Sequence, residues 1–291
     1  MKFIRFKQGE MIKSALITVN NEFVEIGEID YFSFFNHLKD NQSSAETFID
    51  NNNLKRQTNV DIDSLQLVVP IEAEEVWASG VTYLKSKDAR NYESTDGKLD
   101  SETFYDKVYD AERPEIFLKS TKRRTVGPND EVYIRKDSNW QIPEPELALV
   151  IGEGEEIIGY TLGNDMSCRD IEGENPLYLP QAKVWKNSCS IGPAILLPEA
   201  IENPYSLELN CKIYRDGEEL FSGDATVSQL KRKFDELVHY LVKENDIVPG
   251  TILLTGTCIV PPNNFTLQVG DEIYISSTQI GTLKNKVSQN Q

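Results

Sequence analysis

The stretch that decides the fold reads Pro143-Glu144-Pro145-Glu146-Leu147-Ala148-Leu149-Val150-Ile151. Its apolar run, and its two prolines, which restrict the backbone to extended geometry, predict a β-strand. Side chains alternate between the two faces of a strand, so Glu144 and Glu146 project from the same face. Carboxylates that converge on one point require a cation or shared protons. Such pairs also arise by chance in a chain with 47 acidic residues, so the pair alone does not define a site.

A third carboxylate follows a second predicted strand, at 157–161, where the chain runs through Asn164-Asp165 into a polar turn. Taken alone, Asp165 fits an ordinary turn residue or a helix N-cap. Taken with the pair before it, Asp165 completes an oxygen-only site. Three oxygen ligands without His or Cys favour Mg²⁺, Mn²⁺ or Ca²⁺ over zinc.

Composition narrows the classes of partner. The 291 residues are 39% hydrophobic and 26% charged, as in ordinary globular proteins. A net charge of −17 disfavours nucleic acid and membrane surfaces as partners, whereas a small anionic substrate stays compatible because a bound cation overrides the global field. The sequence shows neither a transmembrane-length apolar run nor a signal peptide. Its four widely spaced cysteines fit free thiols, so we expect a cytoplasmic protein.

The pattern of the chain predicts two units. Residues 1–70 are expected to form a small N-terminal α/β domain, with strands at 3–6, 15–19, 23–26 and 65–70 and a helix at 31–38. Residues 71–291 are expected to form the catalytic domain, with strands at 132–135, 147–151, 157–161, 207–214, 252–255 and 272–276 and one amphipathic helix at 231–243. Strands dominate and no β-α-β alternation repeats, which indicates an α+β fold with strongly bent sheets.

Three further features lie between these elements. The segment 85–112 is long and polar, which is typical of a functional lid or a disordered loop. Lys183 stands alone in an irregular segment, where it is either a solvated charge or, near a metal, a partner for a substrate carboxylate. The turn Thr255-Gly256-Thr257 ends a strand and offers backbone N–H groups and a hydroxyl to an anion.

These motifs, in this order, resemble those of the fumarylacetoacetate hydrolase superfamily. The resemblance covers residues 76–291 and implies a β-rich fold with bent, roll-like sheets. It also implies Mg²⁺ or Mn²⁺ bound by Glu144, Glu146 and Asp165, a 2-oxo acid or β-diketo acid substrate, and a homo-oligomer, either dimer or tetramer. It rests on Glu144-Pro145-Glu146-Leu147-Ala148, Gly163-Asn164-Asp165-Met166-Ser167-Cys168-Arg169-Asp170, Lys183, Gly192-Pro193 and Thr255-Gly256-Thr257.

Two segments, 105–117 and 174–181, are similar to the 2-keto-3-deoxy-D-arabinonate dehydratase branch of that family. The branch implies dehydration of 2-dehydro-3-deoxy-D-arabinonate to 2,5-dioxopentanoate in pentose catabolism. It also implies that Glu115 is the acid–base residue and that Lys183 holds the substrate carboxylate or stabilises the enolate. The remaining expected substrate contacts are Thr257, Lys119 and Arg169, of which Lys119 also fits a structural role.

A missing histidine separates this chain from the hydrolases of the family, which place a water-activating His just after a Gly-x-x-Tyr turn. Here Gly80-Val81-Thr82-Tyr83 is followed by Leu84-Lys85-Ser86-Lys87, and the two histidines, His37 and His239, lie elsewhere in the sequence. Hydrolysis of a C–C bond needs a general base, so this departure favours dehydration. The name-giving enzyme of the family has a fourth metal carboxylate, and its position corresponds to Ser79 here. The resemblance therefore implies three protein carboxylates on the metal.

Two other functions stay open at this point. One is a hydrolase or decarboxylase of the same family, acting on an acylpyruvate, fumarylacetoacetate or oxaloacetate with the same metal site and a different base. The other is a non-catalytic protein whose acidic cluster binds Ca²⁺ for structural reasons.

Overall fold

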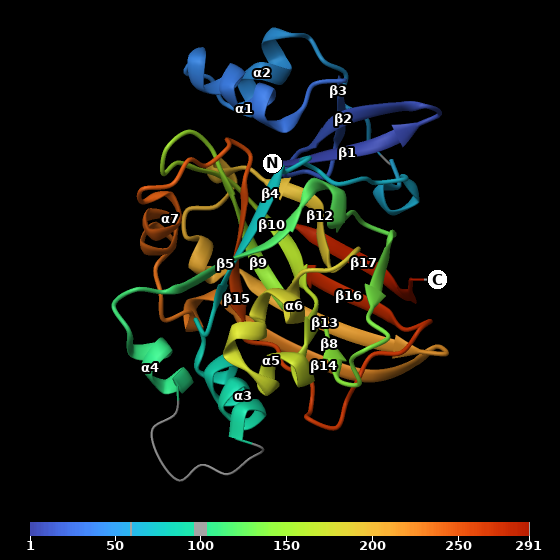
Figure 1. Ribbon diagram of the computed structural model, residues 1–291. Coiled ribbons are helices and arrows are strands. Elements are labelled where there is room, and N and C mark those ends of the chain that lie inside the picture. The colour runs from blue at the N-terminus through green and yellow to red at the C-terminus, as the bar shows by residue number, and fades with distance from the viewer. Residues whose placement is uncertain (59, 96–103, 291) are drawn as a thin grey trace.

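The computed structural model describes residues 1–58, 60–95 and 104–290. Its strands form two large bent sheets, with helices at the edges (Figure 1). The larger sheet has ten strands and carries the predicted carboxylates. Its order is β3 (Phe23–Gly27), β2 (Met11–Ile17), β1 (Lys2–Gln8), β12 (Cys189–Leu196), β10 (Ile157–Asp165), β9 (Pro145–Ile151), β15 (Ile252–Thr257), β4 (Glu75–Gly80) and β5 (Glu115–Thr121), with β6 (Thr125–Val126) paired to β12.

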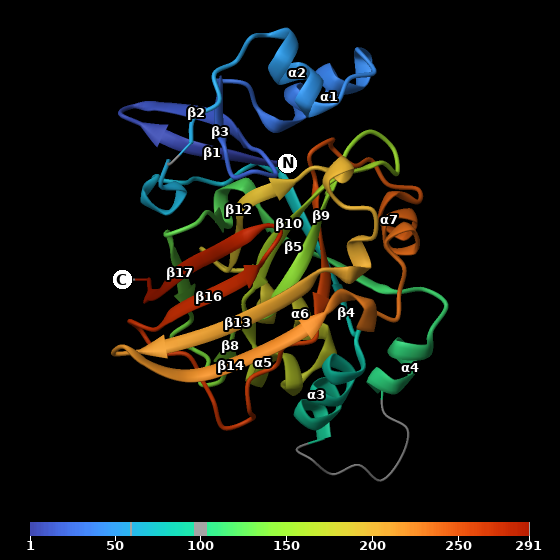
Figure 2. The ribbon, with the colours of Figure 1, turned by 180° about the vertical axis from the view of Figure 1, so that it is seen from behind.

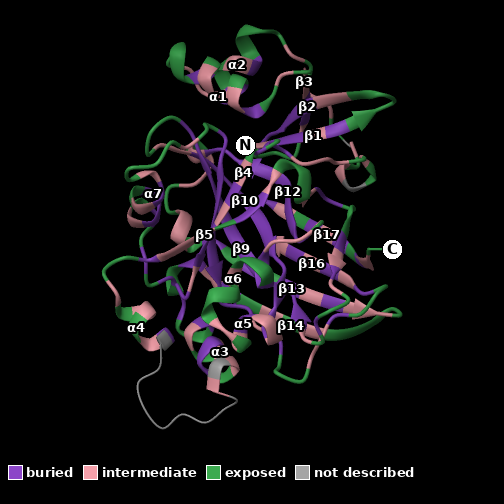
Figure 3. Ribbon diagram, in the orientation of Figure 1, coloured by how far each residue is buried: buried purple, intermediate pink, exposed green. Residues whose placement is uncertain are grey.

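The centre of the large sheet is buried on both faces. Every residue of β9, β12 and β15 is buried, and so is all of β10 after Ile157 (Figure 3). Near-continuous apolar runs are typical of strands covered on both sides. A carboxylate on such a strand is therefore removed from water, which makes the two glutamates of the opening motif costly unless they are compensated.

The second sheet has five strands and packs against the first over the main hydrophobic core (Figure 2). Its strands are β14 (Glu218–Thr226), β13 (Glu208–Arg215), β16 (Glu272–Ser277), β17 (Gly281–Gln289) and β7 (Glu131–Ile134). In β16, Ile273 and Ile275 are buried while Glu272, Tyr274 and Ser276 are half-buried, as strand periodicity requires. A two-stranded ladder of β8 (Gln141–Ile142) and β11 (Ser167–Cys168) lies at the end of the site.

Helices cover the ends of the sheets. The predicted amphipathic helix is α7 (Phe234–Val242), which buries Phe234, Leu237, Val238 and Leu241, so the helix prediction is confirmed. No helix in the described part of the chain combines the length and the apolar composition needed to cross a bilayer. The other helices are α1 (Tyr31–Asp40), α2 (Ala45–Asn51), α3 (Leu84–Thr95), α4 (Phe104–Asp110), α5 (Arg169–Glu174) and α6 (Leu179–Lys183).

The N-terminal strands continue the large sheet, because β1 pairs with β12 at Lys2↔Leu196 and Phe3↔Ile195. Helices α1 and α2 pack on this end, with the rings of Phe3 and Tyr31 5.1 Å apart. The division into domains at residue 70 stays a prediction. The predicted strand at 65–70 is wrong: only an isolated bridge joins Leu67 to Phe6, and Pro70 has no N–H with which to extend a ladder.

The polar segment 85–112 was expected as a lid or a disordered loop, and its described residues are mainly helical, in α3 and α4. The disordered-loop alternative is therefore wrong for the described residues, whereas the lid stays a prediction. Charged side chains help to fix the two helices, and an apolar stripe does not. Arg90 on α3 is only 3% exposed, and Lys87 pairs with Asp106 at 3.1 Å across the two helices. Residues 96–103 lie outside the described part of the chain.

Candidate active site

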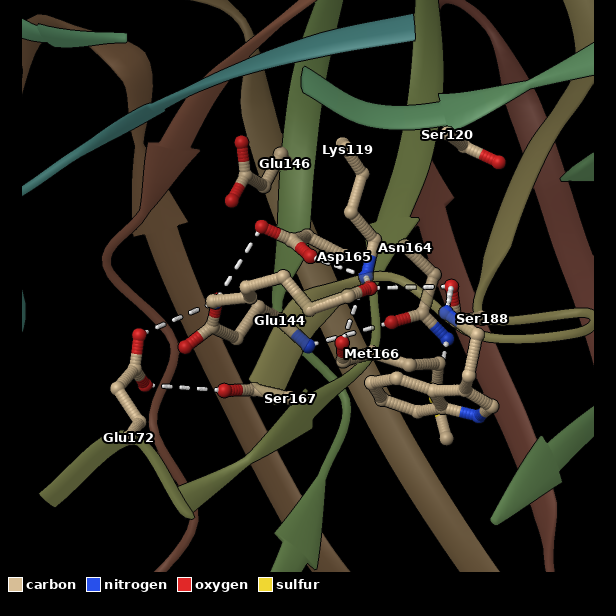
Figure 4. A network of polar contacts seen from close by, with 12 residues as sticks. Lys119, Ser120, Glu144, Glu146, Asn164, Asp165, Met166, Ser167, Glu172 and Ser188 are labelled. Atoms are coloured by element: carbon tan, nitrogen blue, oxygen red, sulfur yellow. Dashed lines mark hydrogen bonds and ion pairs between the residues drawn. The ribbon is translucent and has the colours of Figure 1, made fainter. Parts of the chain in front are cut away.

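Three carboxylates converge at the end of β9 and β10. Glu144 directly precedes β9, Glu146 lies within it opposite Gly163 of β10, and Asp165 ends β10. One oxygen from each lies within 4.8 Å of the other two, and all three residues are buried (Figure 4). The predicted convergence of Glu144, Glu146 and Asp165 is therefore present in the fold.

Burial makes the charged forms of these three carboxylates energetically unfavourable. Desolvation, with the nearby charge of Asp165, raises the pKa of Glu144 to about 7. Desolvation also raises the pKa of Glu146 well above its usual value, and Asp165 and Glu144 add to the effect. Like charges gathered in a dry site favour protonation unless a cation joins them. Oxygen donors alone suit Mg²⁺, Mn²⁺ or Ca²⁺, so the residues fit the expected metal.

Two cations lie against Glu144. Lys183, the last residue of α6, donates to Glu144 Oε2, and its Nζ is 3.3 Å from Asp165 Oδ2. Burial alone would lower the pKa of Lys183, but Asp165 and Glu144 raise it above the usual value, so the ammonium stays protonated. Arg169, at the start of α5, places Nη2 2.7 Å from Glu144 Oε1. Both predicted contact residues therefore reach the site.

Lys119 lies behind the carboxylates. It is fully buried on β5 and donates to the carbonyl oxygens of Met166, at 2.7 Å, and Lys183. Its Nζ also lies 2.7 Å from Asp165 Oδ1, although without the angle of a hydrogen bond. The ammonium thus donates two hydrogen bonds to backbone carbonyls and forms an ion pair with Asp165, so this placement favours the structural role over a substrate contact.

Glu115 enters the site from the edge of the large sheet, where β5 pairs with β4 and Glu115 lies opposite Gly80. Its Oε2 is shielded from solvent and accepts no hydrogen bond from the described residues. Desolvation raises the pKa of Glu115, although the positive charge of Arg90 works against the shift. No Lys, Arg or His of the described chain forms an ion pair with Glu115, so its carboxylate has the character of an available base.

The sequence patterns did not predict three charged residues of the site, namely Arg90, Glu93 and Glu172. Arg90 of α3 places Nη1 2.6 Å from Glu172 Oε1, while Glu93 of the same helix pairs with Arg169. Ser167 donates to Glu172 Oε2 at 3.1 Å. The spacing of Arg169 and Glu172 on one helix was a usable signal, whereas Arg90 and Glu93 are indistinguishable in sequence from a solvated helix surface.

The buried charges of the site do not cancel. We define the buried charge cluster as the carboxylates and cations that line the site. Six carboxylates face four cations, which leaves two negative charges in excess when all are ionised, and one divalent cation would balance them. The members are Glu93, Glu115, Glu144, Glu146, Asp165 and Glu172, with Arg90, Lys119, Arg169 and Lys183.

The turn at the end of β15 faces Glu146. Thr257 lies opposite Glu146 in the β15–β9 ladder, and its hydroxyl makes a 3.2 Å hydrogen bond to the carbonyl of Ile259. The N–H of Gly256 donates to Glu146 Oε2 at 2.5 Å, so the anion served by this turn is a side chain of the site itself. The hydroxyl of Ser79 is also buried and finds no partner among the described residues.

Comparison with known proteins identifies the class. The family model for the C-terminal region of fumarylacetoacetate (FAA) hydrolase matches residues 85–288. The chain belongs to this family. Its α+β fold with bent sheets is also that of similar solved structures, so the predicted fold is confirmed. One of them, 5-carboxymethyl-2-hydroxymuconate delta-isomerase from Mycobacterium smegmatis, is 24% identical with a TM-score of 0.69 over the whole of both chains, a likeness of fold alone.

Two relatives and a solved structure that are at least 36% identical to this chain have the names of sugar-acid dehydratases. The "2-dehydro-3-deoxy-D-arabinonate dehydratase" of Saccharolobus solfataricus is 39% identical over 292 residues, covering 99% of this chain and 97% of the relative. A "probable 2-keto-3-deoxyxylonate dehydratase" of Haloferax volcanii is 50% identical over 220 residues, covering 76% and 74%. A solved "2-keto-3-deoxy-D-arabinonate dehydratase complexed with magnesium and 2,5-dioxopentanoate" is 36% identical, with a TM-score of 0.86 over all of both chains.

Proposed function

We propose that this chain is a divalent-metal-dependent dehydratase that converts 2-dehydro-3-deoxy-D-arabinonate to 2,5-dioxopentanoate in pentose catabolism. The observation that carries the proposal is the pairing of a buried oxygen-only triad with a separate carboxylate, Glu115, that is free of ion pairs to described residues. The triad fits a metal that binds a 2-keto acid. Glu115 supplies a base for a proton on the carbon next to the keto group.

Glu144, Glu146 and Asp165 would hold the cation, Mg²⁺ in the first instance and Mn²⁺ or Ca²⁺ as alternatives. When bound, the cation supplies Lewis acidity that polarises the 2-keto group and acidifies the hydrogens on C3. Lys183 keeps its proton and so acts through its charge, either on the substrate carboxylate or on the negative charge that develops at the keto oxygen. Arg169 holds Glu144 in place.

Glu115 would perform the proton transfers. Its carboxylate takes a proton from C3, and the resulting acid returns a proton to the C4 hydroxyl, which leaves as water. The product of this step is a C3–C4 alkene that still carries the C5 hydroxyl. Moving a proton from C5 to C3, followed by ketonisation of the C5 enol, gives the aldehyde of 2,5-dioxopentanoate. The raised pKa of Glu115 suits a group that alternates between base and acid.

The relatives' names support one substrate. A 2-keto-3-deoxy acid has lost the stereocentres at C2 and C3, where D-arabinonic and D-xylonic acids differ. The remaining centre, C4, has the same configuration in both. In the D series, the two names therefore describe the same compound, which we propose as the substrate.

Product analysis tests the proposal against its alternative. The purified protein with Mg²⁺ should form 2,5-dioxopentanoate from 2-keto-3-deoxy-D-arabinonate. Release of acetate from an acylpyruvate, or of CO₂ from oxaloacetate, without any dioxopentanoate would favour the hydrolase or decarboxylase. Binding of Ca²⁺ with no turnover of any of these acids would favour the structural metal site.

Three broader expectations belong to the same proposal. We expect a homo-oligomer, dimer or tetramer, which light scattering of the purified protein tests. We expect cytoplasmic localisation, which the four free, buried cysteines support. We also keep the division at residue 70 as a proposal, tested by limited proteolysis between 52 and 70.

A further inference from the structure

The ammonium of Lys183 faces three carboxylates. It contacts Glu144, lies 3.3 Å from Asp165 Oδ2 and lies 4.0 Å from Glu172 Oε1. The first two carboxylates belong to the proposed metal triad and the third does not. Lys183 is 1% exposed, so it cannot compensate the loss of a partner by turning to water.

A divalent cation would change this balance. The cation would bind Glu144 and Asp165, the two triad carboxylates that Lys183 now faces, and the two positive centres would repel each other. Lys183 must then weaken its contact with Glu144 while remaining inside a dry site. Among the carboxylates with which it pairs in the described chain, only Glu172 lies outside the triad.

Glu172 is built to receive such a charge. Its side chain is 1% exposed, and Ser167 fixes the Oε2 atom with a 3.1 Å hydrogen bond (Figure 4). The Oε1 atom, which faces Lys183, accepts no hydrogen bond of good geometry from the described residues, although Arg90 Nη1 lies 2.6 Å away. One oxygen of Glu172 is therefore held by Ser167, and the other, although it is paired with Arg90, can still accept a hydrogen bond.

We propose that Glu172 is a positioning residue that receives the Lys183 ammonium when a cation occupies Glu144, Glu146 and Asp165. In that position Lys183 is held for the substrate carboxylate instead of competing with the metal. Arg90 shares the same oxygen of Glu172, so helix α3, which covers the site, is connected to the position of the lysine. This inference rests on the proposed metal site and extends it to a residue outside the triad.

A double-mutant cycle on Mg²⁺ binding, measured by calorimetry without substrate, tests the coupling. Glu172→Gln keeps the size of the side chain and the hydrogen bond from Ser167, and should weaken Mg²⁺ binding about tenfold, or about 1.4 kcal/mol. In a Lys183→Met background the same change should have little effect, because the competing ammonium is gone. Equal weakening in both backgrounds would show a simple field effect of the lost charge and overturn the inference. Glu174→Gln, an exposed change on the same helix, is the matched control.

A structure of the wild-type protein with Mg²⁺ gives a second decision that needs no variant. The distance from Lys183 Nζ to Glu172 Oε1 should shorten from 4.0 Å to hydrogen-bond length. A lysine that stays on Glu144 with the cation bound would overturn the inference and leave the proposed function intact. A wild-type protein that binds no Mg²⁺ would instead overturn the metal site, and this inference with it.

Discussion

Gly80 and Glu115 face each other across the β4–β5 ladder, and the carboxylate of Glu115 occupies the space where a Cβ on residue 80 would stand. Glycine at this position is thus a steric requirement of the proposed base. The same crowding helps to keep Glu115 Oε2 away from water, which is the cause of its raised pKa. One glycine therefore affects both the position and the basicity of the group.

Gly80→Ala should displace Glu115 and lower kcat by at least tenfold while leaving Mg²⁺ binding unchanged. Crowding of this kind also costs about 1–3 kcal/mol of stability. Gly159→Ala is the control, because a Cβ there would clash with Ile195 and Tyr31, which lie outside the site. Both variants should lose stability in denaturant unfolding. Normal kcat in Gly80→Ala would contradict the placement of Glu115.

Glu115→Gln should lower kcat by about 10²–10⁴, since the amide cannot accept the C3 proton. The variant should bind Mg²⁺ and unfold like the wild type, because within the described part of the chain Glu115 forms no ion pair and its Oε2 accepts no hydrogen bond. Glu131→Gln, on the exposed side of β7, controls for the loss of one charge. A drop in Mg²⁺ affinity matching the drop in kcat would instead assign Glu115 to the metal.

The pH dependence of kcat follows from the same carboxylate. A base acts in its deprotonated form, and the pKa of Glu115 is raised above the ordinary 4.5. With Mg²⁺ saturating at every pH, kcat should therefore fall as pH decreases, with a midpoint above 4.5. The acid limb should be absent from the residual rate of Glu115→Gln. An unchanged limb in that variant would assign it to another group.

Lys119→Met should destabilise the protein by about 3–5 kcal/mol, because it leaves Asp165 and two carbonyl oxygens buried without their cation. Equilibrium unfolding in denaturant measures the loss. Saturation with Mg²⁺ should recover part of it, since the ion supplies the charge that Asp165 lacks. Wild-type stability together with a raised KM would show that Lys119 contacts the substrate after all.

The sequence predicted the triad because its geometry is local. Glu144 and Glu146 share a strand face by periodicity, and Asp165 ends the adjacent antiparallel strand, so strand pairing alone brings them together. The strands and α7 followed from hydrophobic patterns for the same reason. The match of the three residues to a family pattern then distinguished them from the chance acidic pairs of an acidic chain.

The rest of the site depends on contacts that periodicity does not encode. Arg90 and Glu93 reach the site only because α3 folds back onto α5, a docking made by ion pairs in a segment whose polarity suggested a loop. For Lys119 the sequence left a structural role and a substrate contact open, and only the direction of its side chain, toward Asp165, favours the structural role. The role of Gly80 follows from an absent side chain, visible only when the opposing strand is in place.

The most direct test of the account is the Mg²⁺ dependence of 2,5-dioxopentanoate formation by the wild type and by Glu146→Gln. The wild type should form the product from 2-keto-3-deoxy-D-arabinonate with Mg²⁺, lose the activity in EDTA and regain it when Mg²⁺ is restored. Glu146→Gln should fold but stay inactive at the same Mg²⁺ concentration, because an amide cannot replace the anionic ligand. Full activity in EDTA, or in Glu146→Gln, would contradict the assignment of the buried carboxylates to a catalytic metal.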